Sequence, residues 1–367
     1  MVSQRTWYAI EMSCVTGYPR GSHEALRGVN LASGSEEPFV VALILNWNNL
    51  PDTLECVDSV RCSDYSNLAV WVVDNDSQED PTAVLHERYP DLRVLRNPRN
   101  LGYGGGNNAG LKWAIGEGAA YVLLLNNDVV VAPDCVRRLV TAAEADSRIG
   151  MATPKVFYYD RPAEVYWDGG IVDWESGEAP HESRGLPVEG GIVKSEWLDG
   201  CSLLVRVATI REVGLLDQRY FLYFEDTDWS VRAARRGWMN AVVLDARAWH
   251  KVNRTAGGFA NPVMRFYHFR NRYLFLTAHG PSRGRLRWKL RYAWIMCSGY
   301  MRARHEREGR QVFLAVLVDL LRGRSGPYET TGIGRQLVVG LDALLVLSMK
   351  SAKPIKRFLQ WLGRMVT

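Results

Sequence analysis

The chain has 367 residues, of which 47% are hydrophobic and 23% are charged, and its formal net charge is +5. These proportions are typical of a folded globular protein and exclude a disordered or fibrous chain. No run of about 18 apolar residues is present, so we expect no membrane-spanning helix. Residues 1–12 lack the apolar core of a signal peptide.

Charge is distributed unevenly along the chain. Residues 281–367 contain 17 Lys+Arg against 5 Asp+Glu, whereas residues 1–280 contain 28 against 35. A basic end on an acidic body predicts an anionic partner, either nucleic acid or a membrane face. The basic end lacks a recognised nucleic-acid motif, and its aromatic residues lie among aliphatic ones. We therefore expect no nucleic-acid partner, and a cytoplasmic protein held peripherally on the inner face of the cell membrane.

The cysteines are scattered, with no Cys-x-x-Cys pair and no dense framework. This spacing predicts reduced thiols in a cytosolic compartment and no zinc module. The six positions are Cys14, Cys56, Cys62, Cys135, Cys201 and Cys297.

Predicted strands and helices alternate along the first half of the chain. This alternation predicts an α/β fold with a doubly wound parallel sheet. The predicted strands are 39–45, 68–73, 92–95, 121–125, 203–205 and 241–244. The predicted helices are 51–63, 81–89, 107–116, 134–146, 207–213 and 228–236.

Three regions differ in composition. Residues 1–37 are polar and aperiodic, and we interpret them as a flexible leader. Residues 38–262 hold the alternating pattern and form the predicted α/β domain. Residues 263–367 are helical and basic, and their cationic segment 350–364 carries apolar residues that favour a membrane interface. The alternative for that segment is a helix packed on the core with a solvated basic face.

Acidic residues gather where predicted strands end. The apolar run 121–125 is followed by Asn126, Asn127 and Asp128, and ligands of open α/β sheets bind at the carboxyl ends of strands. Asp74 and Asp76 follow an earlier strand, and Glu225, Asp226 and Asp228 form a third cluster. The set suits one divalent cation, one diphosphate and one general base.

A glycine-rich stretch, residues 102–106, lies between the first two acid clusters. We expect it to be a flexible turn running into the helix at 107–116. It is not a dinucleotide fingerprint, because Asn107 stands where that motif needs Gly or Ala. Backbone amides near the start of the helix would offer contacts to an anion.

Four motifs occur in a fixed order: VVDNDS at 72–77, NLGYGGGNNAG at 100–110, LLNND at 124–128 and FLYFEDTD at 221–228. In this order they resemble the inverting family 2 glycosyltransferases of the GT-A fold, and especially the bacterial rhamnosyltransferase branch. The resemblance extends over about residues 39–275. It implies a Rossmann-like, mixed but mostly parallel sheet with flanking helices, followed by a basic helical C-terminal region.

The resemblance also implies residue roles. Asp74 would read the pyrimidine base, Asp128 would bind Mg²⁺ or Mn²⁺, and His250 would be a late metal or diphosphate contact. Asp226, with Glu225 beside it, would be the general base. Further substrate contacts would come from Asn46, Asn75, Asn100, Gly102, Gly105, Asn107, Asn127, Trp197, Asp199 and Arg270. One departure is Asn126, which stands where many members carry a second acid.

The implied reaction is the transfer of a sugar, L-rhamnose from dTDP-rhamnose, to a polyprenyl-diphosphate-linked saccharide in cell-envelope polysaccharide synthesis. The alternative is a nucleotide-sugar-binding module without catalysis. An inverting transfer needs a base on the face opposite the diphosphate, and burial beside Phe224 and Trp229 would raise its pKa. Simpler structural roles also remain open: Asp228 pairing with Arg232, His250 in the core, and Asp76 in a turn.

Overall fold

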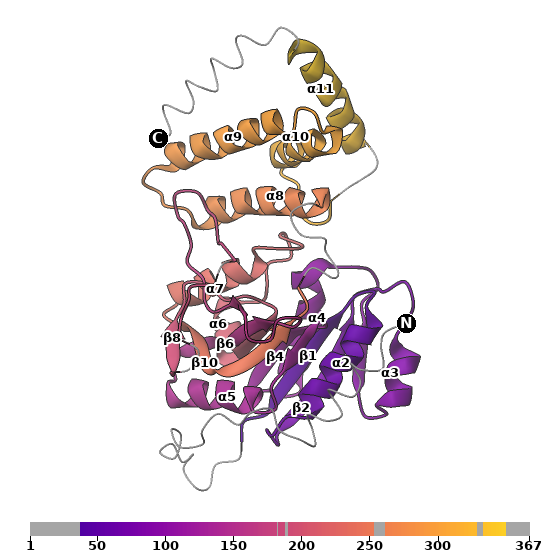
Figure 1. The fold of residues 1–367 in the computed structure, drawn as a ribbon, viewed down its shortest axis with the longest axis vertical. Coiled ribbons are helices and arrows are strands. Elements are labelled where there is room, and N and C mark those ends of the chain that lie inside the picture. Colours follow the sequence, from indigo (N-terminus) through magenta and orange to yellow (C-terminus); the bar gives the residue numbers. More distant parts are fainter. Residues whose placement is uncertain (1–36, 182, 188–189, 253–260, 329–332, 350–367) are drawn as a thin grey trace.

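The computed structural model describes residues 37–181, 183–187, 190–252, 261–328 and 333–349 (Figure 1). The predicted leader, apart from Glu37, and the cationic segment 350–364 lie outside these ranges. An α/β part carries the sheet, and a layer of C-terminal helices lies beyond it, with helix α8 between the two (Figure 1).

The described residues form one mixed sheet with strand order β3-β2-β1-β4-β9-β6-β10-β5, and β7 and β8 pair with β6 and β10. The strands are β1 Val40–Asn46, β2 Leu68–Asp74, β3 Arg93–Arg96, β4 Tyr121–Asn126, β5 Val129–Val131, β6 Ile149–Tyr158, β7 Val165–Trp167, β8 Ile192–Lys194, β9 Ser202–Arg206 and β10 Met239–His250. Strands β3, β2, β1 and β4 are parallel, and β9 runs antiparallel between β4 and β6.

The chain changes direction across the sheet at β1 and β4. It passes from β1 to β2 and β3 on one side, then returns to β4 on the other side of β1. Right-handed crossovers in opposite directions place α2 and α4 on opposite faces of the sheet. Strand β1 is therefore covered on both sides, which explains its nearly unbroken apolar sequence. The carboxyl ends of β1 and β4 form the topological switch point where such sheets bind ligands.

Two helices begin earlier than the sequence predicts. The helices of this part are α2 Leu50–Arg61, α3 Thr82–Arg88, α4 Gly102–Gly116, α5 Cys135–Ala145, α6 Val207–Val213 and α7 Glu225–Arg235. The expected flexible turn at 102–106 is wrong, because the glycines form the first turns of α4. Close packing requires them: a Cβ on Gly106 would lie 2.7 Å from Leu45 Cδ1. The third acid cluster likewise starts a helix and does not end a strand.

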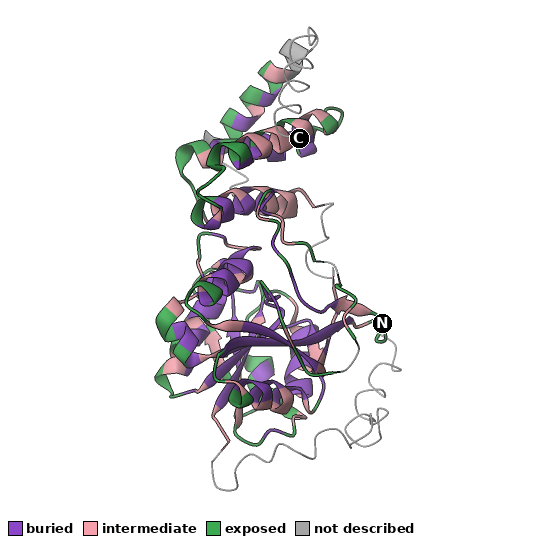
Figure 2. Cartoon of the chain, turned by 90° about the vertical axis from the view of Figure 1, so that its left-hand side faces the viewer, coloured by how far each residue is buried: buried purple, intermediate pink, exposed green. Residues whose placement is uncertain are grey.

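The C-terminal helices have a core of their own. They are α8 Pro262–His279, α9 Arg285–Arg302, α10 Arg307–Arg322 and α11 Ile333–Met349. Phe266, Tyr300, Val312 and Val316 are among the buried side chains between them. Figure 2 shows buried residues throughout the sheet, whereas α9 and α11 expose much of their surface. None of the helices in the described ranges has the length and apolar character needed to span a bilayer.

The cysteine prediction needs one correction. Cys56, Cys135 and Cys201 are buried free thiols and Cys297 is an exposed free thiol, as expected. Cys62 is disulfide-bonded, which the scattered spacing did not predict.

Candidate active site

Polar side chains at the ends of β1, β2 and β4 bond to one another across the sheet edge. Asn46 pairs in register with Asp74 and donates from Nδ2 to Asp74 Oδ1 at 2.7 Å. Its Oδ1 accepts from Thr53 Oγ1 at 2.6 Å and from Asn127 Nδ2 at 3.4 Å. We call Asn46, Thr53, Asp74 and Asn127 the strand-edge cluster. Three of the predicted substrate-binding residues are thus brought together.

Asp74 is fully buried and its second oxygen is also occupied. Oδ2 accepts from the Ser77 backbone N–H at 3.2 Å and lies 3.4 Å from Arg96 Nε. Arg96 also pairs with Asp80 at 2.6 Å. In contrast, the Trp47 ring beside this cluster is 42% exposed. A large aromatic side chain between two asparagines at a strand end was the available signal for this residue, and the sequence reading missed it.

Two more predicted residues, Asn75 and Asn100, hold the entrance to helix α4. Asn75 Nδ2 donates to Asn100 Oδ1 and to the Gly102 carbonyl, both at 3.1 Å, and its Oδ1 accepts from the Leu101 amide at 3.1 Å. Asn107 lies one turn further on, and its buried Oδ1 has no hydrogen-bond partner among the described residues. These residues therefore set the position of the helix start beside β2.

Gly105 lies in the same first turns of α4. A Cβ at this position would lie 2.7 Å from Leu101 Cβ and 3.7 Å from Gln218. A side chain would therefore clash with Leu101, whereas its distance to Gln218 is an ordinary contact, and the structure gives Gly105 a packing role.

The predicted metal residues form a buried pair. His250 Nε2 lies 3.1 Å from Asp128 Oδ1. Burial by itself would raise the pKa of Asp128, but the hydrogen bond and charge of His250 outweigh it and the pKa is lowered. Burial would lower the pKa of His250, yet Asp128 raises it. The two groups therefore stabilise each other as an ion pair.

This pair also fits a divalent cation. No group of three or more His, Cys, Asp or Glu side chains with metal-ligand geometry occurs within the described residues. Mg²⁺ is commonly held by one or two carboxylates, with the remaining ligands from substrate phosphate and water. Asp128 supplies such a carboxylate and His250 a nitrogen, and the buried His250 Nδ1 has no hydrogen-bond partner in the described part of the chain. The donor set therefore suits a cation that arrives with a diphosphate.

The predicted base lies in the first turn of α7. Asp226 Oδ2 accepts from the Gly200 amide at 3.0 Å, and Oδ1 accepts from the Thr227 amide at 2.6 Å. Burial and then the charge of Asp199 raise the pKa of Asp226, against an opposing effect of His181. Burial, followed by Asp226, also raises the pKa of Glu225. Asp226 nevertheless keeps part of its surface exposed, so a substrate can reach it.

Asp199 precedes β9 and is nine-tenths buried. Its Oδ1 accepts from the Cys201 amide at 2.8 Å, while Oδ2 has no hydrogen-bond partner among the described residues. The same is true of Glu225 Oε2. We call Asp199, Glu225 and Asp226 the helix-end acids. Two of them, Asp199 and Glu225, each carry a buried oxygen that accepts no hydrogen bond from the described residues.

Asp128 and two of the helix-end acids, Asp199 and Asp226, all influence Cys201. Burial raises the pKa of this thiol, and the charges of Asp199, Asp128 and Asp226 raise it further. The Cys201 carbonyl also accepts from the Asn126 amide at 2.9 Å, which joins the start of β9 to the end of β4. The adjacent amides of Gly200 and Cys201 donate to Asp226 and Asp199, and the Cys201 carbonyl bonds the strand end that precedes Asp128, so all three carboxylates belong to the same edge of the sheet.

Aromatic residues close this region. Trp197 is fully buried, and its ring packs edge-on against His181 at 4.7 Å. His181 Nδ1 lies 3.6 Å from Asp199 Oδ2. Tyr103 donates its hydroxyl to the Gly200 carbonyl at 2.5 Å. Sequence reasoning missed both His181 and Tyr103, because their partners are distant in the sequence.

One predicted substrate residue has a different role in the structure. Arg270 is fully buried and donates to the carbonyl oxygens of Gly326 at 2.6 Å and Tyr220 at 2.9 Å. Its guanidinium therefore holds the backbone and is not directed to the acids. The structural alternative for Asp228 is confirmed, because Oδ2 accepts from Arg232 Nε at 2.7 Å. The turn role of Asp76 is confirmed by its left-handed φ of 66°.

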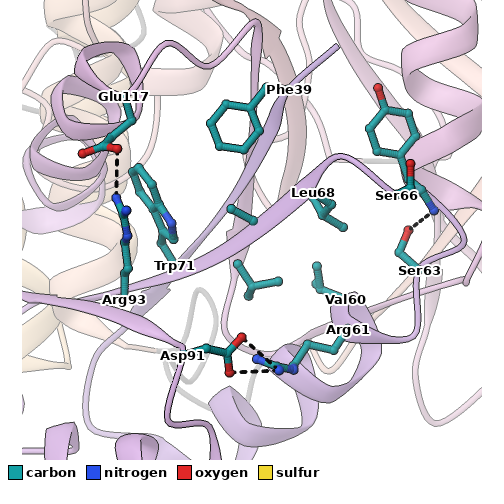
Figure 3. Close-up of a pocket in the computed structure, with 13 residues that line it drawn as sticks. Phe39, Val60, Arg61, Ser63, Ser66, Leu68, Trp71, Asp91, Arg93 and Glu117 are labelled. Carbon is teal, nitrogen blue, oxygen red and sulfur yellow. Dashed lines mark hydrogen bonds and ion pairs between the residues drawn. The ribbon is translucent and has the colours of Figure 1, made fainter. Parts of the chain in front are cut away.

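A pocket of about 560 Å³ lies elsewhere, at the amino-terminal ends of β1 and β2 (Figure 3). Its charged lining residues are already paired: Arg61 lies 3.0 Å from Asp91, and Arg93 lies 3.2 Å from Glu117. Ligands of open α/β sheets bind at the opposite ends of the strands. The acids at the carboxyl ends are therefore the better candidate site.

Residues 42–187 match the family model described as glycosyl transferase family 2. This part of the chain is similar to the family 2 glycosyltransferases. The match includes Asp74 and Asp128 but ends before the helix-end acids, so the roles of those acids depend on geometry.

Curated relatives of this glycosyltransferase include rhamnosyltransferases. An N-acetylglucosaminyl-diphospho-decaprenol L-rhamnosyltransferase of Mycobacterium tuberculosis is 29% identical over 260 residues, which cover 64% of this chain and 83% of the relative. A dTDP-rhamnosyl transferase of Shigella flexneri is 21% identical, covering 57% and 71%.

Solved structures show the same GT-A fold. Staphylococcus aureus TarS 1–349 in complex with UDP-GlcNAc has a TM-score of 0.50 at 14% identity, covering 77% of this chain and 81% of TarS. GalNAc-T7 with UDP, GalNAc and Mn²⁺ has a TM-score of 0.50 at 17% identity, and the match covers 58% of this chain and 43% of that chain. The predicted fold class is confirmed.

Proposed function

We propose that this glycosyltransferase transfers L-rhamnose from dTDP-rhamnose, with inversion, to a saccharide carried on a polyprenyl diphosphate, in the synthesis of a cell-envelope polysaccharide. The observation that carries the proposal is that the Gly200 and Cys201 amides bond Asp226 and Asp199, while the Cys201 carbonyl bonds the end of β4 that carries Asp128 and borders the strand-edge cluster. Two relatives named as rhamnosyltransferases, one of them for a diphospho-decaprenol acceptor, support the donor and the acceptor class.

In this proposal the donor nucleotide lies along the strand-edge cluster. Asp74 orders the edge that receives the pyrimidine through its bonds to Asn46 and Ser77, and Trp47, the residue after Asn46, is 42% exposed and available to the base. The ordered amides of Asn46, Asn75 and Asn127 pre-organise this edge, so little conformational entropy is lost on binding.

The chemistry lies with the helix-end acids. Asp226 accepts the proton of the acceptor hydroxyl as that oxygen bonds to the sugar C1, while the bond from C1 to the diphosphate oxygen breaks on the opposite face. Its raised pKa makes it a stronger base than an exposed carboxylate. Asp199 Oδ2 and Glu225 Oε2 are free to accept hydrogen bonds from sugar hydroxyls. A divalent cation, Mg²⁺ or Mn²⁺, held by Asp128 and His250 would neutralise charge on the leaving diphosphate.

Helix α11 supports a peripheral position on the membrane. Leu337, Gly340, Leu341 and Leu344 follow the spacing i, i+3, i+4 and i+7, so they share one side of the helix, and the three leucines are 43%, 38% and 65% exposed. Helix α9 exposes Arg285, Arg287, Lys289 and Arg302. An apolar stripe beside cationic residues suits the interface of an anionic bilayer. Flotation of the protein with anionic and with neutral vesicles tests this point, since binding to neither would exclude it.

The full-length protein should be incubated with dTDP-rhamnose, Mn²⁺ or Mg²⁺ and a polyprenyl-diphosphate-linked GlcNAc acceptor. We expect a rhamnosylated lipid product whose anomeric configuration is inverted relative to the donor. A panel of other nucleotide sugars serves as the donor control. Transfer from another donor would change the substrate assignment, and nucleotide-sugar binding without transfer from any donor would favour the non-catalytic alternative.

A further inference from the structure

The loop before helix α7 has an unusual backbone. Phe221, Tyr223 and Phe224 have φ angles of 66°, 68° and 73°. Aromatic residues rarely adopt this left-handed conformation, because the Cβ atom crowds the backbone. Such a conformation persists only when the surrounding structure imposes it, and it concentrates at functional sites. Here it lies directly before Glu225 and Asp226.

Asn271 of helix α8 imposes this conformation from one side. Its side chain is fully buried, and Nδ2 donates to the carbonyl oxygens of Tyr220 at 2.8 Å, Leu222 at 2.7 Å and Tyr223 at 2.9 Å. Arg270 Nε donates to Asn271 Oδ1 at 3.0 Å, which fixes the orientation of the amide. The NH₂ group of one side chain thus bonds three of the four backbone carbonyls of residues 220–223.

Helix α4 holds the loop from the other side. The Tyr103 amide donates to the Phe221 carbonyl at 2.7 Å, and a Cβ on Gly102 would lie 2.2 Å from that same oxygen. The Phe221 ring stacks on Tyr267 of α8 at 5.3 Å. The loop is therefore fixed between the glycine-rich start of α4 and helix α8 of the C-terminal layer.

We propose that Asn271 is a positioning residue for the reaction. By holding the loop in its left-handed conformation, it makes α7 begin at Glu225, with the Asp228 amide bonded to the Phe224 carbonyl at 2.8 Å. This start directs the Asp226 carboxylate to the Gly200 amide. The C-terminal helices are thereby part of the catalytic unit. The inference rests on the proposed role of Asp226 as the base.

Two substitutions of Asn271 test this role in the full-length protein. Asn271→Asp has the same shape but replaces the donating NH₂ with an oxygen that repels the three carbonyls, whereas Asn271→Ser keeps one donor without repulsion. Displacing a reacting group by about 1 Å costs about 10²-fold in rate, so we expect a loss of that order in kcat for Asn271→Asp. The KM for the donor should stay close to that of the wild type, and Asn271→Ser should lie between them.

Tyr300→Phe is the matched control. It removes a buried hydrogen bond of 2.9 Å to Asp342 within the same helical layer, but it leaves the loop untouched. We expect this variant to lose some thermal stability and to keep the wild-type kcat. A fall in kcat equal to that of Asn271→Asp would show that any weakening of the C-terminal helices lowers activity, and it would overturn the positioning role.

Hydrogen exchange provides a readout that needs no donor. Asn271→Asp should speed amide exchange at residues 221–228 while leaving the strands of the sheet protected. Wild-type exchange in that segment, or wild-type kcat in a folded Asn271→Asp protein, would overturn the proposal. A third outcome is faster exchange in Asn271→Asp but no transfer from dTDP-rhamnose by the wild type. That result would support the role of Asn271 in holding the loop and would reject the proposed donor.

Discussion

The strand-edge cluster and the helix-end acids lie close together but differ in how their polar atoms are satisfied. Asn46 and Asp74 bond to each other and to neighbouring side chains, and both are almost completely buried. Asp199 and Glu225 each leave one buried carboxylate oxygen without a partner in the described structure. A satisfied cluster is rigid before the substrate arrives, whereas unsatisfied acceptors gain their bonds from the substrate. This difference fits our proposal, in which the first group binds the donor and the second carries the chemistry.

The largest expected effect comes from Asp226→Asn. Removing a general base costs about 10²–10⁴-fold in rate, and kcat for transfer should fall within that range. Binding of dTDP with Mn²⁺, measured by thermal shift, should remain, because the strand-edge cluster and Asp128 are unchanged.

The same variant should not destabilise the protein. Because the pKa of Asp226 is raised in the folded state, the folded state binds this proton more tightly than the unfolded state, and the carboxylate weakens folding as pH rises through that pKa. The substitution also replaces one of the two oxygens that accept from the Gly200 and Thr227 amides with a donor, so the two effects offset each other and we expect an unfolding midpoint at pH 7.5 close to that of the wild type. A lower midpoint together with lost nucleotide binding would mean that the substitution disrupts the site as a whole.

Asp128→Ala tests the proposed cation site. Loss of the proposed cation contact should remove several kcal/mol of transition-state stabilisation, so kcat/KM should fall by about 10²-fold or more. Unlike Asp226→Asn, this variant should also lose the Mn²⁺-dependent part of the thermal shift with dTDP. If Asp128→Ala keeps that shift, the metal assignment is wrong and the pair with His250 is structural.

A smaller effect is expected in the pH profile. The base must be ionised, so activity is lost as pH falls through the pKa of Asp226. The Asp199 charge raises that pKa and His181 lowers it. Asp199→Asn should therefore move the acidic limb of kcat to lower pH, and His181→Phe should move it to higher pH. Initial rates from pH 5 to 9 measure both, and shifts in the same direction would refute the electrostatic assignment.

The sequence predicts the two halves of the site unequally well, for a physical reason. Parallel strands buried on both faces give continuous apolar runs, so β1, β2 and β4 and the polar residues at their ends follow directly from the pattern. The pairing of Asp228 with Arg232 follows from helical spacing. Both signals are local in the sequence, and the strand-edge cluster depends on the first of them, the polar residues at strand ends.

The remaining features depend on contacts between distant segments. Glycine has a low helix propensity, yet residues 102–106 are helical, and Gly106 packs closely against Leu45. No local pattern predicts the left-handed conformation of Phe224, after which α7 begins three residues before the predicted start. The resemblance implied a substrate contact for Arg270, and its structural role was not predicted, because the backbone carbonyls that it binds lie about 50 residues away in the sequence. His181 was missed for the same reason.

The smallest expected effect concerns the rigidity of the strand-edge cluster itself. Thr53 is fully buried and donates to Asn46 Oδ1, so Thr53→Val leaves that oxygen with only the longer bond from Asn127. Loss of a buried hydrogen bond costs about 1–2 kcal/mol, which should appear in the free energy of unfolding in urea, with little change in kcat.

Thr209→Val is the matched control for Thr53→Val. Thr209 is a fully buried helical threonine whose Oγ1 has no partner among the described residues, so its replacement by valine should be neutral or stabilising. Equal losses in the two variants would mean that the cost comes from the shape of valine in a helix, and that the bonds of the cluster add nothing to its rigidity. A loss confined to Thr53→Val would show that the donor edge owes its order to these bonds, which is the property that separates it from the helix-end acids.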